Sequence, residues 1–134
     1  MRIFLSYRYT GEDPAQVESI LGNICASLQE AGHEPYCFFL ANKGKNLHFT
    51  SKQIIEEAFR EIDKAELVLV YIKSPEKSEG MILEVGYSLA RGKRFMVASL
   101  KGVTTTYMHG LAERVIEFSD VEELYDKLRN LKID

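Results

Sequence analysis

The sequence has few cysteines, no long apolar run and no excess of positive charge, and each absence excludes a class of protein. Its 134 residues include only two cysteines, Cys25 and Cys37, in no CxxC or His/Cys spacing, so neither a disulfide framework nor a metal site is expected. No apolar stretch approaches the roughly 20 residues of a membrane span. A net charge of -3 argues against non-specific nucleic-acid binding, which needs a basic face.

The composition predicts one globular domain with reduced thiols. A chain of 134 residues, 46% hydrophobic and 28% charged, is long enough for a single domain, 1–134, with one core. The first residues, Met1 to Leu5, predict a strand and not a signal peptide. We therefore expect a cytoplasmic protein that binds neither membrane nor nucleic acid and uses no cofactor.

Strand-like and helix-like segments alternate along the whole chain. The continuous apolar character of Leu67–Ile72 indicates a central strand that is covered on both faces. Five strands alternating with helices predict a five-stranded parallel sheet with helices on both faces, of the flavodoxin or Rossmann kind. The expected strands are 2–6, 34–40, 67–72, 94–100 and 114–118; the expected helices are 14–31, 50–64, 78–92 and 120–131, with long loops at 41–49 and 101–110.

Glu84 is the strongest candidate for a functional residue. It lies about one turn inside the helix that follows the apolar strand, among small and apolar residues such as Gly80, Met81 and Gly86. A carboxylate just above a helix N-terminus, at the C-terminal edge of a parallel sheet, occupies the place where open α/β folds put their chemistry. Most helical glutamates are simply solvated. This one is isolated from other polar groups, which favours a functional role.

Two further segments should meet Glu84 at that edge. The loop from Ser6 to Gly11 combines hydroxyls, Arg8 and a glycine, which suits an anion such as phosphate, although a plain connection explains it equally well. Ser78 and Gly80 open the Glu84 helix, where the helix dipole favours the same anion. Glu84 would lie about 6 Å further along the axis. That offset fits a sugar whose phosphate rests on the helix end and whose anomeric carbon meets the carboxylate.

Four segments of the chain together match a known pattern: Ile3–Leu5, Ala65–Val70, the block Gly80…Glu84-Val85-Gly86-Tyr87…Gly92-Lys93, and Met108–Ala112. In these segments the chain resembles the nucleoside 2-deoxyribosyltransferases and their relatives, the 2'-deoxynucleoside 5'-phosphate N-hydrolases. It implies that Glu84 is the nucleophile that attacks C1' of the sugar and displaces the base. The resulting glycosyl ester would be resolved by water or by a second base, with retaining stereochemistry.

The resemblance also implies a branch of the family and an assembly. Ser78 matches a serine of the phosphate-hydrolysing branch, where the transferases carry an acidic residue. Together with Arg8 it points to a nucleoside 5'-monophosphate as substrate. In the family a residue of the neighbouring subunit completes the site and matches Thr105, which implies a homodimer with shared active sites. An ordinary solvated loop is the alternative for Thr105.

Three positions depart from the family pattern. Ala58 stands where the family has an aspartate close to the sugar, and Ile82 stands where a glycine is usual. Phe4 replaces a tyrosine whose hydroxyl could steady Glu84. These departures concern turnover and the preference for deoxyribose; they leave the expected fold unchanged.

Other functions remain open on sequence alone. Residues 3–13 also resemble the start of toll/interleukin-1 receptor domains, some of which cleave NAD while others only bind partners. A nucleoside 2-deoxyribosyltransferase and a non-catalytic nucleotide-binding module are further alternatives. The Glu84 block and Met108–Ala112 fit the deoxyribosyltransferase pattern better than the receptor pattern.

Overall fold

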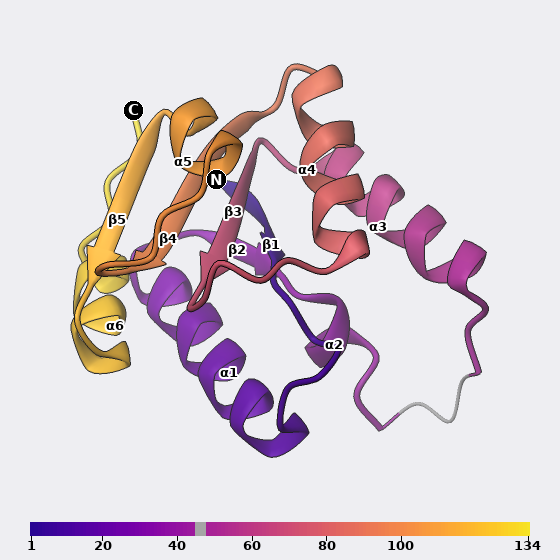
Figure 1. Cartoon of the computed structure of the whole chain (residues 1–134), viewed down its shortest axis with the longest axis horizontal. Helices are drawn as coiled ribbons and strands as arrows, with labels where there is room; N and C mark the ends of the chain where they lie inside the picture. The colour runs from indigo at the N-terminus through magenta and orange to yellow at the C-terminus, as the bar shows by residue number, and fades with distance from the viewer. Residues whose placement is uncertain (45–47) are drawn as a thin grey trace.

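The computed structural model describes residues 1–44 and 48–134. Part of the expected loop 41–49, including Asn46, therefore lies outside the described residues. Five strands form one parallel sheet in the order β2-β1-β3-β4-β5 (Figure 1), which confirms the expected fold class. They are β1 (Arg2–Ser6), β2 (Glu34–Tyr36), β3 (Leu67–Ile72), β4 (Arg94–Leu100) and β5 (Arg114–Phe118).

Helices cover both faces of this sheet. The core on one face is closed by α1 (Pro14–Glu30) and α6 (Val121–Arg129), and the core on the other by α3 (Ser51–Lys64), α4 (Glu79–Ala90) and α5 (Tyr107–Leu111) (Figure 1). The short α2 (Phe38–Ala41) follows β2. None of the described helices is long and apolar enough to cross a membrane.

The alternation of side chains along β1 decides which residues face α4. Ile3 and Leu5 pack in the core with α1 and α6, whereas Phe4 packs in the core with α3 and α4. Because successive side chains of a strand point to opposite faces, Ser6 shares the face of Phe4. The last side chain of β1 therefore points toward the helix that carries Glu84.

The expected strand 34–40 is wrong in its second half. Strand pairing ends at Tyr36, and the next apolar residues form α2, in which the amide of Ala41 donates to the carbonyl of Cys37 at 2.9 Å. β2 is an edge strand that contains Pro35, which has no amide to donate. The hydroxyl of Tyr7 accepts a hydrogen bond of 3.0 Å from the amide of Phe39, which stabilises the turn into a helix.

The expected loop 101–110 is also partly wrong, because α5 begins inside it at Tyr107. Met108 is only 6% exposed and packs in the core beside α3 and α4. Burial of this single side chain anchors a helix of little more than one turn, which is too short for periodicity in the sequence to reveal.

Candidate active site

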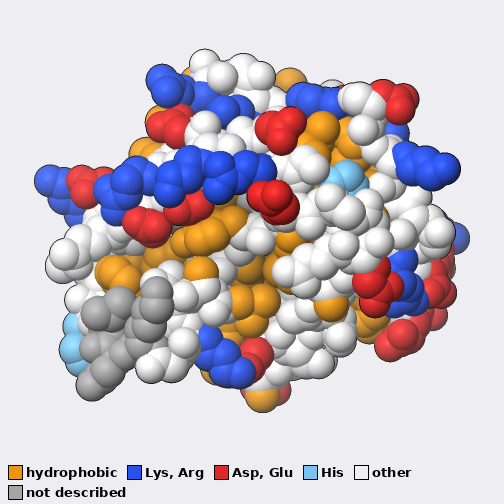
Figure 2. Space-filling view, turned by 180° about the vertical axis from the view of Figure 1, so that it is seen from behind, with side chains coloured by type: hydrophobic (Ala, Val, Ile, Leu, Met, Phe, Trp, Pro, Cys, Tyr) orange, Lys and Arg blue, Asp and Glu red, His pale blue; other side chains and the backbone are white. Residues whose placement is uncertain are grey.

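A cleft of about 500 Å³ lies beside the end of β1, bounded by α2, α3 and the first turns of α4. This volume lies within the range of about 300–1,000 Å³ usual for small-molecule sites. Its walls are mostly apolar, and Tyr9 and Ile54 are each 40% exposed there. Hydrophobic side chains gather at the surface on the back of the molecule, below a row of lysine and arginine side chains (Figure 2).

Glu84 lines this cleft and is held by Ser6. The Ser6 hydroxyl donates a hydrogen bond of 2.7 Å to Oε1 of Glu84. Burial raises the pKa of Glu84 to about 7, the Ser6 hydrogen bond opposes that rise, and negative charge at Cys37 adds to it. A carboxyl group with a pKa near neutrality in a cleft is a candidate for a nucleophile or a general acid/base.

Because its pKa is raised, Glu84 destabilises the folded protein when it is ionised at high pH. Glu84→Gln should remove this destabilisation. Between the ordinary value of 4.5 and about 7, the folded state binds the Glu84 proton more tightly than the unfolded state does. The free energy of unfolding therefore falls as pH rises through that window. The shift corresponds to about 3 kcal/mol at pH 8. We expect Glu84→Gln to melt several degrees above the parent at pH 8, and level with it near pH 4.

Melting curves at the two pH values test this prediction. Glu79→Gln is the matched control, since Glu79 is exposed on the same helix. It should give no increase, because a carboxylate in the first turn of a helix is stabilising. An equal rise of the melting temperature of Glu84→Gln at both pH values would show that the effect is not one of ionisation.

Ser78 and Gly80 lie in the same cleft, at the N-terminus of α4. Ser78 is the N-cap, and its Oγ accepts a hydrogen bond of 3.1 Å from the amide of Met81. Helix geometry leaves the amides of Glu79 and Gly80 without an intrahelical partner. The structure thus brings four of the predicted residues (Ser6, Ser78, Gly80 and Glu84) to one place, with a free helix end beside a carboxylate.

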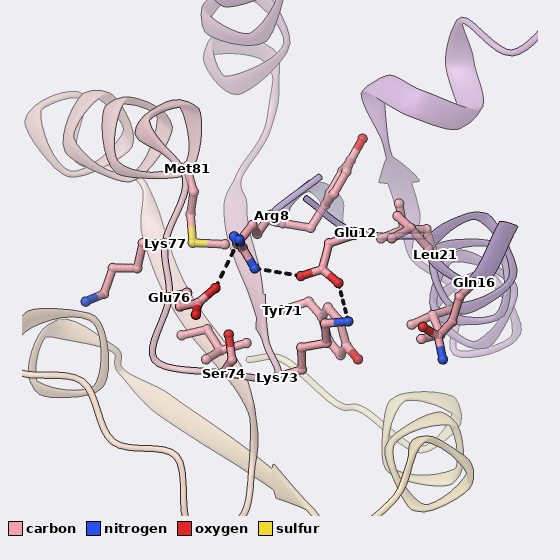
Figure 3. Close-up of a pocket in the computed structure, with 14 residues that line it drawn as sticks. Arg8, Glu12, Gln16, Leu21, Tyr71, Lys73, Ser74, Glu76, Lys77 and Met81 are labelled. Carbon is pink, nitrogen blue, oxygen red and sulfur yellow. Dashed lines mark hydrogen bonds and ion pairs between the residues drawn. The ribbon is translucent and has the colours of Figure 1, made fainter. Parts of the chain in front are cut away.

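The structure does not bring Arg8 to this cleft (Figure 3). Its guanidinium pairs with Glu12 at 2.8 Å and with Glu76 at 3.0 Å, and Lys73 also pairs with Glu12. These residues line a neighbouring cavity of about 30 Å³, which has room for little more than a water molecule. Glu12 stands four residues from Arg8, but both lie in the loop before α1, where this spacing does not by itself predict an ion pair.

Thr105 is not among the residues that line the cleft either. Its Oγ1 lies 2.5 Å from Nδ1 of His109 and accepts a hydrogen bond of 3.1 Å from the His109 amide. The other ring nitrogen of His109 lies 3.0 Å from Oγ of Ser99 at the end of β4. Within this chain, Thr105 orders the segment between β4 and α5.

Aromatic side chains of the cleft were missed at the sequence level. Tyr9 and Phe39 have ring centroids 5.2 Å apart, and Phe38 meets Phe49 edge-on at 5.7 Å. On the strand expected at 34–40, Phe38 and Phe39 would point to opposite faces. On α2 both line one cleft. Their planar rings supply a surface on which a flat heteroaromatic ligand can stack.

The sheet order and the acidic group above a helix end define a flavodoxin-like α/β protein with a small-molecule site. The profile of the nucleoside 2-deoxyribosyltransferase family matches residues 7–120, and the chain belongs to that family. It is therefore an enzyme of glycosyl transfer or hydrolysis on nucleosides. The family expected from the Glu84 block is confirmed.

Solved structures support the fold over nearly the full chain. A CMP N-glycosidase of Clostridium botulinum, BcmB, is 19% identical, with a TM-score of 0.69 over 96% of this chain and 97% of that one. A 2-deoxyribosyltransferase of Bacillus psychrosaccharolyticus is 18% identical, with a TM-score of 0.74 over 98% and 93%. A conserved protein of Enterococcus faecalis is 15% identical, with a TM-score of 0.66 over 96% of each chain. A search of curated proteins gives no match.

Proposed function

We propose that the protein hydrolyses the N-glycosidic bond of a nucleoside 5'-monophosphate, with Glu84 as the nucleophile. The observation that carries this proposal is the carboxylate of Glu84, anchored by Ser6 and lining a cleft of about 500 Å³ one turn above the N-terminus of α4. Membership of the family indicates that an N-glycosidic bond is the one cleaved. The volume of the cleft is sufficient for a nucleotide.

The carboxylate of Glu84 takes part in both steps of the proposed reaction, first as the nucleophile and then as the leaving group. An oxygen of Glu84 attacks C1', the bond from C1' to the base nitrogen breaks, and its electron pair leaves with the base, which takes up a proton. Water then attacks C1' of the glycosyl ester, loses one proton to solvent, and releases the sugar phosphate and the free carboxylate; this proton balances the one that the base took up. The net reaction consumes one water and yields the base and the sugar phosphate.

The phosphate is proposed to rest at the start of α4. The amides of Glu79 and Gly80, which the start of a helix leaves without an intrahelical partner, and the helix dipole favour an anion there. Ser78 adds a hydroxyl and no negative charge, so it does not repel phosphate. Arg8 stays a prediction as a phosphate ligand; to reach the cleft it would have to leave both Glu76, whose side chain is 67% exposed, and Glu12, whose side chain is 10% exposed.

The base is proposed to lie against the aromatic wall of the cleft. Tyr9 and Phe39 present rings on the side of the cleft formed by α2 and the residues after β1. Stacking of a base on an aromatic ring contributes about 1–3 kcal/mol. It does so without selecting one base, because every base has a flat face.

A substrate panel tests the proposal. Purified protein is incubated with ribo- and deoxyribonucleosides, their 5'-monophosphates and NAD, and the released base is quantified by chromatography. We expect release from monophosphates, and slower release from unphosphorylated nucleosides. Exchange onto an added second base without hydrolysis would identify a deoxyribosyltransferase, and release from NAD alone would identify the receptor-like activity. Binding with no turnover would leave a nucleotide-binding module.

We also propose that the chain acts as one domain, as a cytoplasmic homodimer in which Thr105 of each subunit completes the partner's site. The support lies in the family resemblance and in exposed apolar side chains on α4 and α5. They are Ile82 (52% exposed), Leu83 (46%), Tyr107 (76%) and Leu111 (55%). Both cysteines are free thiols, which suits a reducing compartment.

Mixing two inactive variants tests the shared site. Glu84→Ala and Thr105→Trp chains are each expected to be inactive alone. After random subunit exchange, half of the dimers are mixed, and each mixed dimer has one site with both residues intact, so about a quarter of the parent activity should return. A parent that is monomeric and fully active at the assay concentration would rule the shared site out.

A further inference from the structure

Ser6 occupies a place from which it can act on Glu84 and not on a ligand. It is the last residue of β1, its side chain is fully buried, and it pairs in register with Val70 of β3. Its Oγ lies 2.7 Å from Oε1 of Glu84, the distance of a charge-assisted O–H···O bond. Ser6 is not among the residues that line the cleft.

Ser6 has less conformational freedom than the Glu84 side chain to which it donates. β1 is paired with β2 as far as Phe4 and with β3 as far as Ser6, so the backbone of Ser6 is held by its pairing with Val70, and its side chain has a single rotatable bond to the hydroxyl. Glu84 has three rotatable bonds and one oxygen in this contact. Phe4, on the same face of β1, offers no hydroxyl.

We infer that Ser6 is a positioning residue for Glu84: its hydroxyl fixes Oε1 and thereby leaves Oε2 free to attack C1'. This inference deepens, and rests on, the proposed function of Glu84 as nucleophile. It also replaces the expectation from the sequence that Ser6 binds substrate. A nucleophile held by one oxygen keeps its reacting atom within the narrow range of geometry that attack requires.

The same hydroxyl favours the ionised form of Glu84. A hydrogen bond donated to a carboxylate lowers its pKa, and here it acts against burial. The titratable groups whose charge interacts with Glu84 are Cys37, at the start of α2, and Tyr7, just after β1. Glu79 and Lys43 line the same cleft, and Lys43 pairs with Glu18. Within the described part of the chain no cation is paired with Glu84, and the hydrogen bond from Ser6 favours its ionised form.

Kinetics of Ser6→Ala over pH 5 to 9 test the inference. We expect kcat at pH 7 to fall about 10- to 100-fold, with KM changed less than about threefold, because the hydroxyl touches the nucleophile and not the substrate. The acidic limb of the pH profile should move up by about one unit. Ser6→Cys, with a weak donor of similar size, should lie between Ser6→Ala and the parent.

Ser88→Ala is the matched control, because Ser88 is an equally buried hydroxyl of α4 that bonds the Val85 carbonyl and not Glu84. It should leave the acidic limb in place. A Ser6→Ala protein with the parent's acidic limb and kcat, or one altered in KM alone, would overturn the positioning role. If Ser6→Ala does not fold, the position of the limb in Ser6→Cys decides the question.

The role of Ser6 can be tested separately from the proposed reaction, because the pKa of Glu84 can be measured without turnover. If the parent releases no base, the carboxyl signal of Glu84 can be followed by NMR across the same pH range and assigned with Glu84→Gln. The pKa of Glu84 should be higher in Ser6→Ala than in the parent. An unchanged pKa would overturn the role of Ser6 whatever the enzyme's substrate is.

Discussion

Glu84→Gln and Glu84→Ala should each lose base release by about 10⁴-fold or more, because the atom that attacks C1' is removed. The fold should survive both changes, since α4 is anchored in the core by Met81 and Val85 and not by Glu84. The Gln variant is the sharper test: its amide oxygen can still accept the Ser6 hydrogen bond, so position is kept while the nucleophile is lost.

Base release measured by chromatography, together with calorimetric binding of an intact monophosphate, separates chemistry from binding. Glu56→Gln is the matched control, a glutamate that is exposed on the neighbouring helix α3 and pairs with Lys52. It should keep its activity within about twofold. A Glu84→Gln protein that retains a tenth of the parent rate would remove Glu84 from the nucleophile's role.

The sheet could be predicted from the sequence because its strands carry unambiguous patterns. β3 is apolar and β-branched-rich over six residues between polar segments, a pattern typical of a central strand covered on both faces, and all six residues are buried. The segment Phe38–Leu40 is different, because a short apolar run fits a strand as well as a helix. Its helical form is supported by a hydrogen bond to the Tyr7 hydroxyl, 32 residues from Phe39, which leaves no local pattern in the sequence.

In the candidate site, too, some features could be predicted from the sequence and others could not. Glu84, Ser78 and Gly80 could be predicted because their positions follow from one strand and one helix. The alternation along β1 could also have predicted that Ser6 meets α4. The surroundings of Arg8 could not be predicted, since one of its two partners, Glu76, lies in the loop between β3 and α4, far along the chain. Contacts between distant loops depend on packing that no local pattern records.

Ser78→Asp should weaken the binding of nucleoside monophosphates by about 100-fold and leave unphosphorylated nucleosides unaffected or better bound. A second negative charge within about 4 Å of a phosphate is worth several kcal/mol even in a partly polar surrounding. Aspartate is as good an N-cap as serine, so its carboxylate can still accept from the amide of Met81 and α4 should begin at the same residue. The change is therefore one of charge and not of fold.

Ser78→Asn separates the effect of the added charge from the effect of replacing the N-cap, because asparagine also caps helices and carries no charge. It should bind monophosphates within about threefold of the parent, while Ser78→Asp does not. Dissociation constants for one nucleoside and its 5'-monophosphate, measured by calorimetry for the three proteins, give the comparison. A parent that binds both ligands equally well, or an Asp variant that weakens both alike, would mean that no phosphate rests at the start of α4. The ratio of the two constants, and not either one alone, reports the phosphate, because any loss of cleft shape affects both ligands.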